Sequence, residues 1–317
     1  MSTADILLAA AQALAYLVLA PLLVGWTRKA KAVLQNRRGA SVLQPARNLR
    51  KLFSKETRVA HTASPLFRVT PYVVFTATWL AAAAVPLLAT NLPTAAIADV
   101  IVVAGLLGLA RFFMALAGMD VGTAFGGMGA SREMMVSGLA EPALLMAVFT
   151  LAMSAHSTNL AGMVDHQLAG GSLLLPSMLF ALGGLLLVAI AETGRIPVDN
   201  PSTHLELTMI HEAMILEYSG RHLALLEWAA QVRLVLYGAL IANIFFPWGI
   251  ATTPTLAALG LGIAAIVAKL LALGLLLAVA ETVLAKKRLF HAPAFLNLAF
   301  LLSLLGLLGH VILERGG

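Results

Sequence analysis

The sequence has no cysteine among its 317 residues, and few of its side chains carry a charge. Without a thiol, the chain forms no disulfide and offers no thiolate to an iron–sulfur cluster or a zinc ion. Charged residues make up 11% of the chain, hydrophobic residues make up 60%, and the mean hydropathy is +0.90. Ordinary soluble domains are far more polar. The composition therefore predicts one integral membrane domain over residues 1–317.

Long apolar runs account for most of the chain. Each run is about 20 residues long and lacks the polar–apolar alternation of a barrel strand, so the fold class is predicted to be all-α and polytopic. Positive charges follow the first run instead of preceding it, which favours a spanning helix over a cleaved signal peptide. About eight transmembrane helices are expected, at residues 6–26, 71–89, 97–117, 134–154, 172–191, 232–250, 256–284 and 293–313.

The basic residues predict the orientation in the membrane. Eleven of the 21 Lys and Arg residues lie in the first connection, 28–69, and the second, fourth and sixth connections contain none. Because Lys and Arg concentrate on the cytoplasmic side, the odd-numbered connections are predicted to be cytoplasmic and both termini to lie outside. Apolar residues recur at helical spacing within 42–53, which indicates an amphipathic helix. This helix could lie on anionic headgroups or receive a soluble partner.

An acidic connection, residues 192–231, separates the fifth and sixth apolar runs. Ionisable groups near a bilayer are costly, so a carboxylate cluster there is a candidate ion or proton path. Some of these residues have structural alternatives: Thr203 and Glu206 fit a helix capping box, and Glu192 could pair with Arg195. His204 and His211 lack a third ligand at suitable spacing, so no metal site is predicted. The acidic residues of this region are Glu192, Asp199, Glu206, Glu212, Glu217 and Glu227.

Three further features lie in or beside the apolar runs. Pro142 cannot donate to the carbonyl of Gly138, so Glu141 adjoins an opened helical turn that could carry protons or could be a simple kink. Lys269 and Glu281 lie about 120° apart around one helix, which predicts separate partners or an aqueous cavity. The glycine-rich segment 118–129 lacks the Lys-Ser/Thr ending of a phosphate loop, and its glycines favour tight backbone packing.

The acidic connection also carries a family resemblance. The pattern E-T-x-R-x-P-x-D at 192–199, followed by E-Y-S-G at 217–220, resembles the membrane subunit that anchors the soluble arm in respiratory complex I and in energy-converting [NiFe] hydrogenases. The blocks SREM at 131–134 and LAEPALL at 139–145 are similar to the hydrogenase branch. So are residues 200–209 and 281–290, which resemble formate hydrogenlyase and related group 4 subunits.

The resemblance implies a non-catalytic subunit of an oxidoreductase complex in the bacterial cytoplasmic (inner) membrane, with no nucleic-acid partner. Its expected partners are the [NiFe] hydrogenase large and small subunits, a ferredoxin-like iron–sulfur subunit and antiporter-like membrane subunits. The nickel–iron and iron–sulfur centres would lie on those partners, with no cofactor on this chain. The subunit would anchor the soluble arm and couple proton reduction to proton or sodium movement.

Specific residues follow from this reading. The expected proton or ion path comprises Glu141, Glu192, Asp199, Glu206, Glu212 and Glu217. The expected electrostatic partners are Arg195, Arg221, Lys269 and Glu281. The expected docking residues are Arg37, Arg38, Arg47, Lys51 and Arg132. Two alternatives stay open: the quinone-cavity subunit of a complex I-type NADH dehydrogenase, and a stand-alone ion transporter. The electron donor could be formate, ferredoxin or carbon monoxide.

Overall fold

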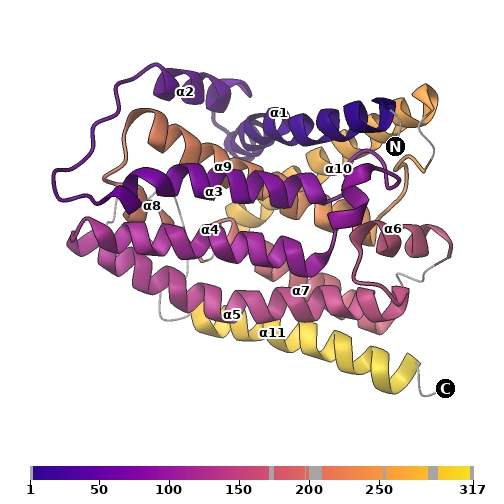
Figure 1. The fold of residues 1–317 in the computed structure, drawn as a ribbon. Helices are drawn as coiled ribbons and strands as arrows, with labels where there is room; N and C mark the ends of the chain where they lie inside the picture. Colours follow the sequence, from indigo (N-terminus) through magenta and orange to yellow (C-terminus); the bar gives the residue numbers. More distant parts are fainter. Residues whose placement is uncertain are drawn as a thin grey trace.

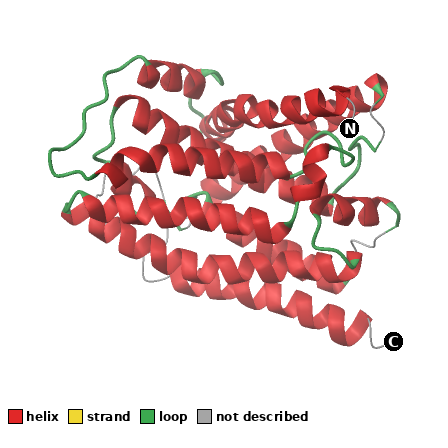
Figure 2. Cartoon of the chain, in the orientation of Figure 1, coloured by secondary structure: helices red, strands yellow, loops and turns green. Residues whose placement is uncertain are grey.

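A computed structural model describes residues 3–170, 175–196, 198–199, 209–252, 255–284 and 292–314. Within these ranges the chain is built from helices and contains no β-strand (Figures 1 and 2). Two isolated bridges, Ala89 with Ala251 and Asp99 with Asn159, connect loops at one end of the bundle. The predicted all-α polytopic class is confirmed.

Each predicted apolar run coincides with a helix. Seven of the helices are long and apolar enough to cross a membrane, whereas α7 has only 17 residues. The helices that coincide with the predicted runs are α1 (Thr3–Leu34), α3 (Pro65–Ala84), α4 (Val100–Asp120), α5 (Ala124–Ala155), α7 (Pro176–Glu192), α9 (Gly220–Leu240), α10 (Leu256–Val283) and α11 (Ala292–Gly309). Short π-helical turns extend α9 (η3, Ile241–Phe245) and α11 (η5, His310–Glu314).

The long helices lie side by side and define two ends of the bundle (Figure 1). α11 packs on α5 and α7, α3 packs between α4 and α9, and α1 packs on α9 and α10. The short helices α2 (Gln44–Phe53) and α8 (His211–Ile215) lie at one end, called here the α2–α8 end. The N-terminus, the 3₁₀ turn η1 (Pro93–Ile97) and α6 (Leu160–Leu168) lie at the other, called the N-terminal end.

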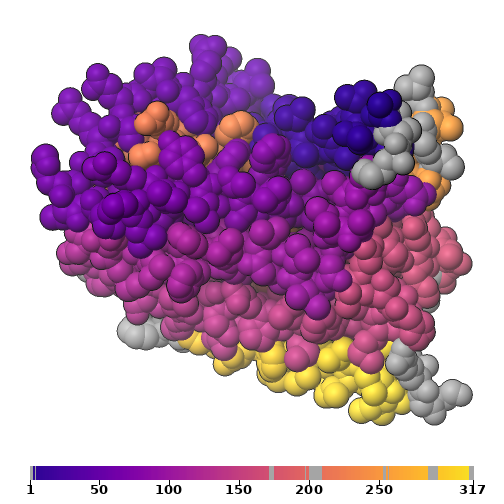
Figure 3. All heavy atoms as spheres, in the orientation of Figure 1, coloured from indigo at the N-terminus to yellow at the C-terminus, as the bar shows by residue number. Residues whose placement is uncertain are grey.

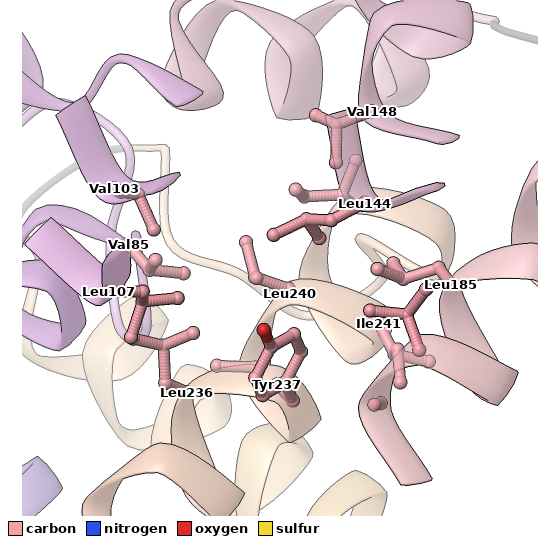
Figure 4. Packing of buried hydrophobic residues seen from close by; sticks show 14 of the residues in the cluster. Val85, Val103, Leu107, Leu144, Val148, Leu185, Leu236, Tyr237, Leu240 and Ile241 are labelled. Atoms are coloured by element: carbon pink, nitrogen blue, oxygen red, sulfur yellow. The ribbon is translucent and has the colours of Figure 1, made fainter. Parts of the chain in front are cut away.

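Side chains from five parts of the fold form the core (Figure 4). Val85 follows α3, Leu107 comes from α4, Leu144 from α5, Leu185 from α7 and Leu236 from α9, and all are buried. On the face shown in Figure 3, α3, α4 and α5 form most of the surface, with α11 along the lower edge. Among the described spanning helices, α9 with η3 is the most buried, with 72% of its most apolar stretch inside the protein.

The predicted amphipathic helix in the first connection is present as α2. Its Leu49 is buried, and its Phe53 ring packs edge-on against Trp228 of α9 with ring centroids 6.0 Å apart. A Cβ atom on Gly25 of α1 would lie only 1.8 Å from the carbonyl oxygen of Val42, so glycine lets this connection lie directly on α1. α2 thus rests on the bundle through its apolar side.

Three predicted helix starts were wrong. The fourth span begins at Ala124, ten residues before the predicted position 134. The second span begins at Pro65, because Ser64 caps it by accepting a hydrogen bond from the Leu66 amide (3.1 Å) and proline suits the first helical position. The sixth span begins at Gly220, twelve residues before the predicted position 232. Charged residues near the start of α9 lower the hydropathy there, so the apolar run seemed to begin later. One of them, Arg233, is buried inside the bundle.

The glycine-rich segment confirms the prediction of tight packing. It forms the turn between α4 and α5, where a Cβ atom on Gly126 would lie 2.1 Å from the carbonyl oxygen of Gly118. Any larger residue would therefore separate the two helices at this crossing. This close contact fixes α5, and with it Glu141, against α4.

A candidate ion path: the buried charge cluster and its cavities

Arg111, in the middle of α4, forms the centre of a buried charge cluster. Its Nη2 lies 2.8 Å from Oε1 of Glu141 in α5, and its Nη1 donates a hydrogen bond to Oε1 of Glu192 at the end of α7. The side chains of Arg111 and Glu192 are each only 3% exposed. One guanidinium thus serves two carboxylates, and such charges are stable inside a protein only when they are paired.

Glu141 is the outward-facing member of this cluster. Its side chain is 40% exposed, and its Oε1 also accepts a hydrogen bond from the Ser137 hydroxyl (2.9 Å) one turn earlier. α5 continues as one helix through Pro142, so Glu141 and Pro142 are consecutive residues of the same helical turn. The cluster therefore reaches from the core of the bundle to its side.

A small cavity of about 30 Å³ adjoins Glu192 on the other side of the cluster. Its volume is enough for about two water molecules, and polar lining groups are what such waters require. Water in this position would join Glu192 to the acidic connection by hydrogen bonds. The ionisable residues that line the cavity are Glu133, Glu192, Asp199, His211 and Arg233.

Asp199 and His211 form the wall between this cavity and the next. The Asp199 carboxylate accepts hydrogen bonds from the backbone amides of Ile210 and His211 (3.3 Å each), which holds the start of α8. Burial lowers the pKa of His211 to about 4, and Arg233 adds to this effect while Asp199 opposes it. The imidazole is therefore neutral at neutral pH and can both donate and accept a hydrogen bond.

A larger cavity of about 560 Å³ opens beyond that wall, between α1, α2, α9 and the acidic connection. Glu212 lines it, and burial together with the nearby Glu227 and Asp199 raises the pKa of the Glu212 carboxyl, against the effect of Arg28. At its edge, Glu281 of α10 binds Lys31 (2.9 Å) and Arg195 (3.2 Å). The two cavities share Thr193, Gly194, Asp199, His211 and Ala230.

The structure brings together most of the predicted path. Glu141, Glu192, Asp199 and Glu212 all border the cluster or the cavities. Glu217 lies beyond α8 and is exposed, so it is not part of this array. Glu206, with Thr203 and His204, lies outside the described residues.

The predicted electrostatic partners have mixed outcomes. The pairing of Glu192 with Arg195 is wrong: Glu192 binds Arg111 and Arg195 binds Glu281. α7 ends at Glu192 and the chain turns at Gly194 (φ +60°), so the spacing rule for residues on one helix does not apply. Lys269 and Glu281 have separate partners, as predicted.

Arg221 and the docking residues lie mainly on the surface. The side chain of Arg221 is exposed, and no ion pair involves it in the part of the chain that the structure describes. Arg132 is half-buried, and its guanidinium donates to the carbonyl of Met209 (2.8 Å), so it fastens the acidic connection to α5. The remaining docking residues, Arg37, Arg38, Arg47 and Lys51, are exposed.

Sequence reasoning missed several residues of this site, above all Arg111. An arginine in the middle of the third apolar run was a detectable signal, because ionisable residues in spanning helices face the bundle interior and have partners there. Glu133 beside the start of the fourth run and Tyr237 in α9 were also missed. The Tyr237 ring is buried in the core close to this cluster (Figure 4).

The fold and the site define a polytopic membrane protein with a buried charge cluster and two adjoining cavities. The sequence matches the NADH dehydrogenase family over residues 6–311, and the chain belongs to that family. It is 36% identical to hydrogenase-4 component C of Escherichia coli (strain K12) over 295 residues, 92% of each chain. It is 33% identical to formate hydrogenlyase subunit 4 of the same organism over 285 residues, which cover 89% of this chain and 91% of the relative.

More distant relatives agree with this assignment. The chain is 27% identical to an NADH-quinone oxidoreductase subunit of Salinibacter ruber over 242 residues, 73% of this chain and 69% of that one. A solved archaeal respiratory complex, the membrane-bound sulfane sulfur reductase, contains a chain of the same fold, with a TM-score of 0.81, 21% identity and coverage of 96% and 98%. The predicted resemblance is thus confirmed, and the relatives are subunits of multisubunit respiratory membrane complexes.

Proposed function

We propose that this chain is the membrane subunit of a hydrogenase complex, and that it couples proton reduction to ion movement through the Arg111 cluster. The observation that carries this proposal is the unbroken series of ionisable groups from the large cavity, through the small one, to Glu141 at the side of the bundle. Nickel–iron and iron–sulfur centres would lie on partner subunits, since this chain has no thiolate to bind them.

The shared arginine supplies a simple way to pass charge along. A carboxylate binds a proton more readily when its cationic partner moves away. Protonation of Glu192 from the cavity would leave the Arg111 guanidinium paired with Glu141. Transfer of that proton to Glu141 would then return the guanidinium to Glu192. Each transfer exchanges one ion pair for another, so no charge is left unpaired in the core.

The anchoring part of the function falls to the α2–α8 end. The exposed basic residues Arg47 and Lys51 lie on the side of α2 opposite to the buried Leu49, and other residues of α2 line the large cavity. A soluble subunit with an acidic surface would be attracted there by charge. Such a subunit would close the large cavity and place its redox changes next to Glu212 and Asp199.

Sealed vesicles that contain the intact complex provide the test. Hydrogen evolution and ion uptake are measured together for wild type, Glu141→Gln and the control Glu56→Gln, whose carboxylate is 89% exposed. We expect Glu141→Gln to retain hydrogen evolution with protonophore present but to lose ion uptake. Unchanged uptake in Glu141→Gln would make Glu141 a structural residue only and would refute the proposed path.

The large cavity also supports a second candidate function. Its volume of about 560 Å³ lies within the usual size range of small-molecule sites. In addition, the chain is similar to a subunit of an NADH-quinone oxidoreductase. The same vesicles distinguish the two functions: quinone reduction without hydrogen evolution would favour the quinone-cavity subunit. A stand-alone transporter would purify without iron–sulfur partners.

A further inference from the structure

Lys269 is an ionisable residue that the path described above does not use. It lies 13 residues after the start of α10, about 20 Å along the helix axis, and therefore within the thickness of a bilayer. Its Nζ donates a hydrogen bond to Oδ1 of Asn243 (3.3 Å) in η3, and no carboxylate pairs with it among the described residues. An amine at this depth without a carboxylate is costly, which marks it as a functional candidate.

Asn243 is held in one orientation by the loop that follows α3. α3 ends at Ala84, and the non-helical residues 85–90 that follow are all buried. The Asn243 amide nitrogen donates to the carbonyls of Pro86 (2.9 Å) and Leu87 (3.3 Å), so its oxygen must face Lys269. This loop lies at the end of α3, and its buried backbone groups need partners, which Asn243 supplies in part.

Two side chains of α1 also bind backbone groups of this loop. Gln12 accepts hydrogen bonds from the amides of Leu87 (3.0 Å) and Leu88 (3.1 Å), and Tyr16 donates to the carbonyl of Val85 (3.1 Å). These loop groups therefore have hydrogen-bond partners other than Lys269. The lysine is not needed as a structural donor to these backbone groups, which leaves its charge unexplained by packing.

We propose that Lys269, with Asn243 as its fixed acceptor, is a proton-carrying site in the half of the bundle nearer the N-terminal end. Both the ammonium and the neutral amine can donate to the Asn243 oxygen, so the hydrogen bond survives loss of the proton. In one cycle the neutral amine takes a proton from the side of the Arg111 cluster, and the ammonium releases it toward the N-terminal end. No other bond forms or breaks.

This inference rests on the proposed ion coupling and adds the identity of the ion. A sodium ion needs several oxygen ligands and would be repelled by an ammonium, whereas a proton needs only a group with a lone pair. Asn243 lies six residues after Tyr237 on the same helix, about 9 Å along its axis. Leu240, Ile241 and Leu144 lie beside Tyr237 in this part of the core, so proton transfer from the Arg111 cluster to Lys269 requires water to enter between these apolar side chains (Figure 4).

The test uses the intact complex in sealed vesicles and compares Lys269→Gln with Lys269→Arg. Glutamine keeps a hydrogen-bond donor without a charge, and arginine keeps the charge but does not release a proton. We expect both variants to lose at least tenfold in proton uptake per hydrogen evolved, with hydrogen evolution within twofold of wild type in the presence of protonophore. The control, Lys29→Gln, removes an exposed lysine of α1 and should leave uptake unchanged.

Three results would overturn the proposal. Full uptake in Lys269→Arg would make the lysine a fixed charge, full uptake in Lys269→Gln would make it dispensable, and a sodium requirement in wild type would exclude proton carriage. If neither variant assembles, Asn243→Asp is tested instead. A carboxylate at this position should stabilise the ammonium and lower proton uptake, and uptake at the wild-type level in Asn243→Asp would refute the site. Absence of any uptake in wild type would instead refute the proposed coupling function.

Discussion

Removing Arg111 should destabilise the assembled protein more than any other single charge change. Arg111→Met leaves Glu192, whose side chain is 3% exposed, without a cationic partner. Breaking a buried ion pair from one side costs on the order of 3–5 kcal/mol. Glu141 contributes less, because its 40% exposed side chain is accessible to other partners. For a chain of this size the cost corresponds to a fall in Tm of roughly 4–8 °C.

Thermal denaturation of the purified complex, followed by the fraction that stays assembled, would measure this fall. The double variant Arg111→Met/Glu192→Gln should recover most of the loss, because a neutral amide replaces the stranded carboxylate. Arg58→Met is the matched control, since Arg58 is 89% exposed. A fall of less than about 2 °C for Arg111→Met, well below the expected cost of an unpaired buried charge, or no recovery in the double variant, would contradict the reasoning.

Three further predictions concern other parts of the same structure. Glu192→Gln should abolish ion uptake in vesicles, whereas Glu217→Gln should not, because only Glu192 borders the cluster; equal effects would argue against the array. The pKa of His211 is about 4 in the folded chain and near 6.5 when unfolded, so the unfolded chain binds its proton first as the pH falls. Stability should therefore decrease from pH 6.5 to pH 4, and the Tm of His211→Gln should show a smaller slope. Gly25→Ala should lower the yield of assembled complex, since its Cβ would collide with the Val42 carbonyl; a normal yield would show that the first connection can shift.

The sequence predicted well what depends on local composition. Apolar runs gave the helices, and the periodic Leu49 and Phe53 gave α2, because burial and helical period are properties of a few neighbouring residues. The start of α9 was missed for the same reason. Arg233 and Glu227 reduce local hydropathy, and only the fold shows that Arg233 is buried in the bundle and that Glu227 lines a cavity.

The ion pairs show why the site itself was harder to predict. Glu281 binds Lys31, which lies 250 residues away in the sequence, and Arg195, which lies 86 residues away, while Arg111 and Glu192 are 81 residues apart. No local spacing rule connects such residues. A rule does hold one level higher: an ionisable residue inside a spanning helix must find its partner on another helix. Applied to Arg111, this rule points to the carboxylates of Glu141 and Glu192 on other helices, and among the described residues it points to no carboxylate for Lys269. The same reasoning that explains the paired arginine therefore leaves the lysine as the charge that calls for a function.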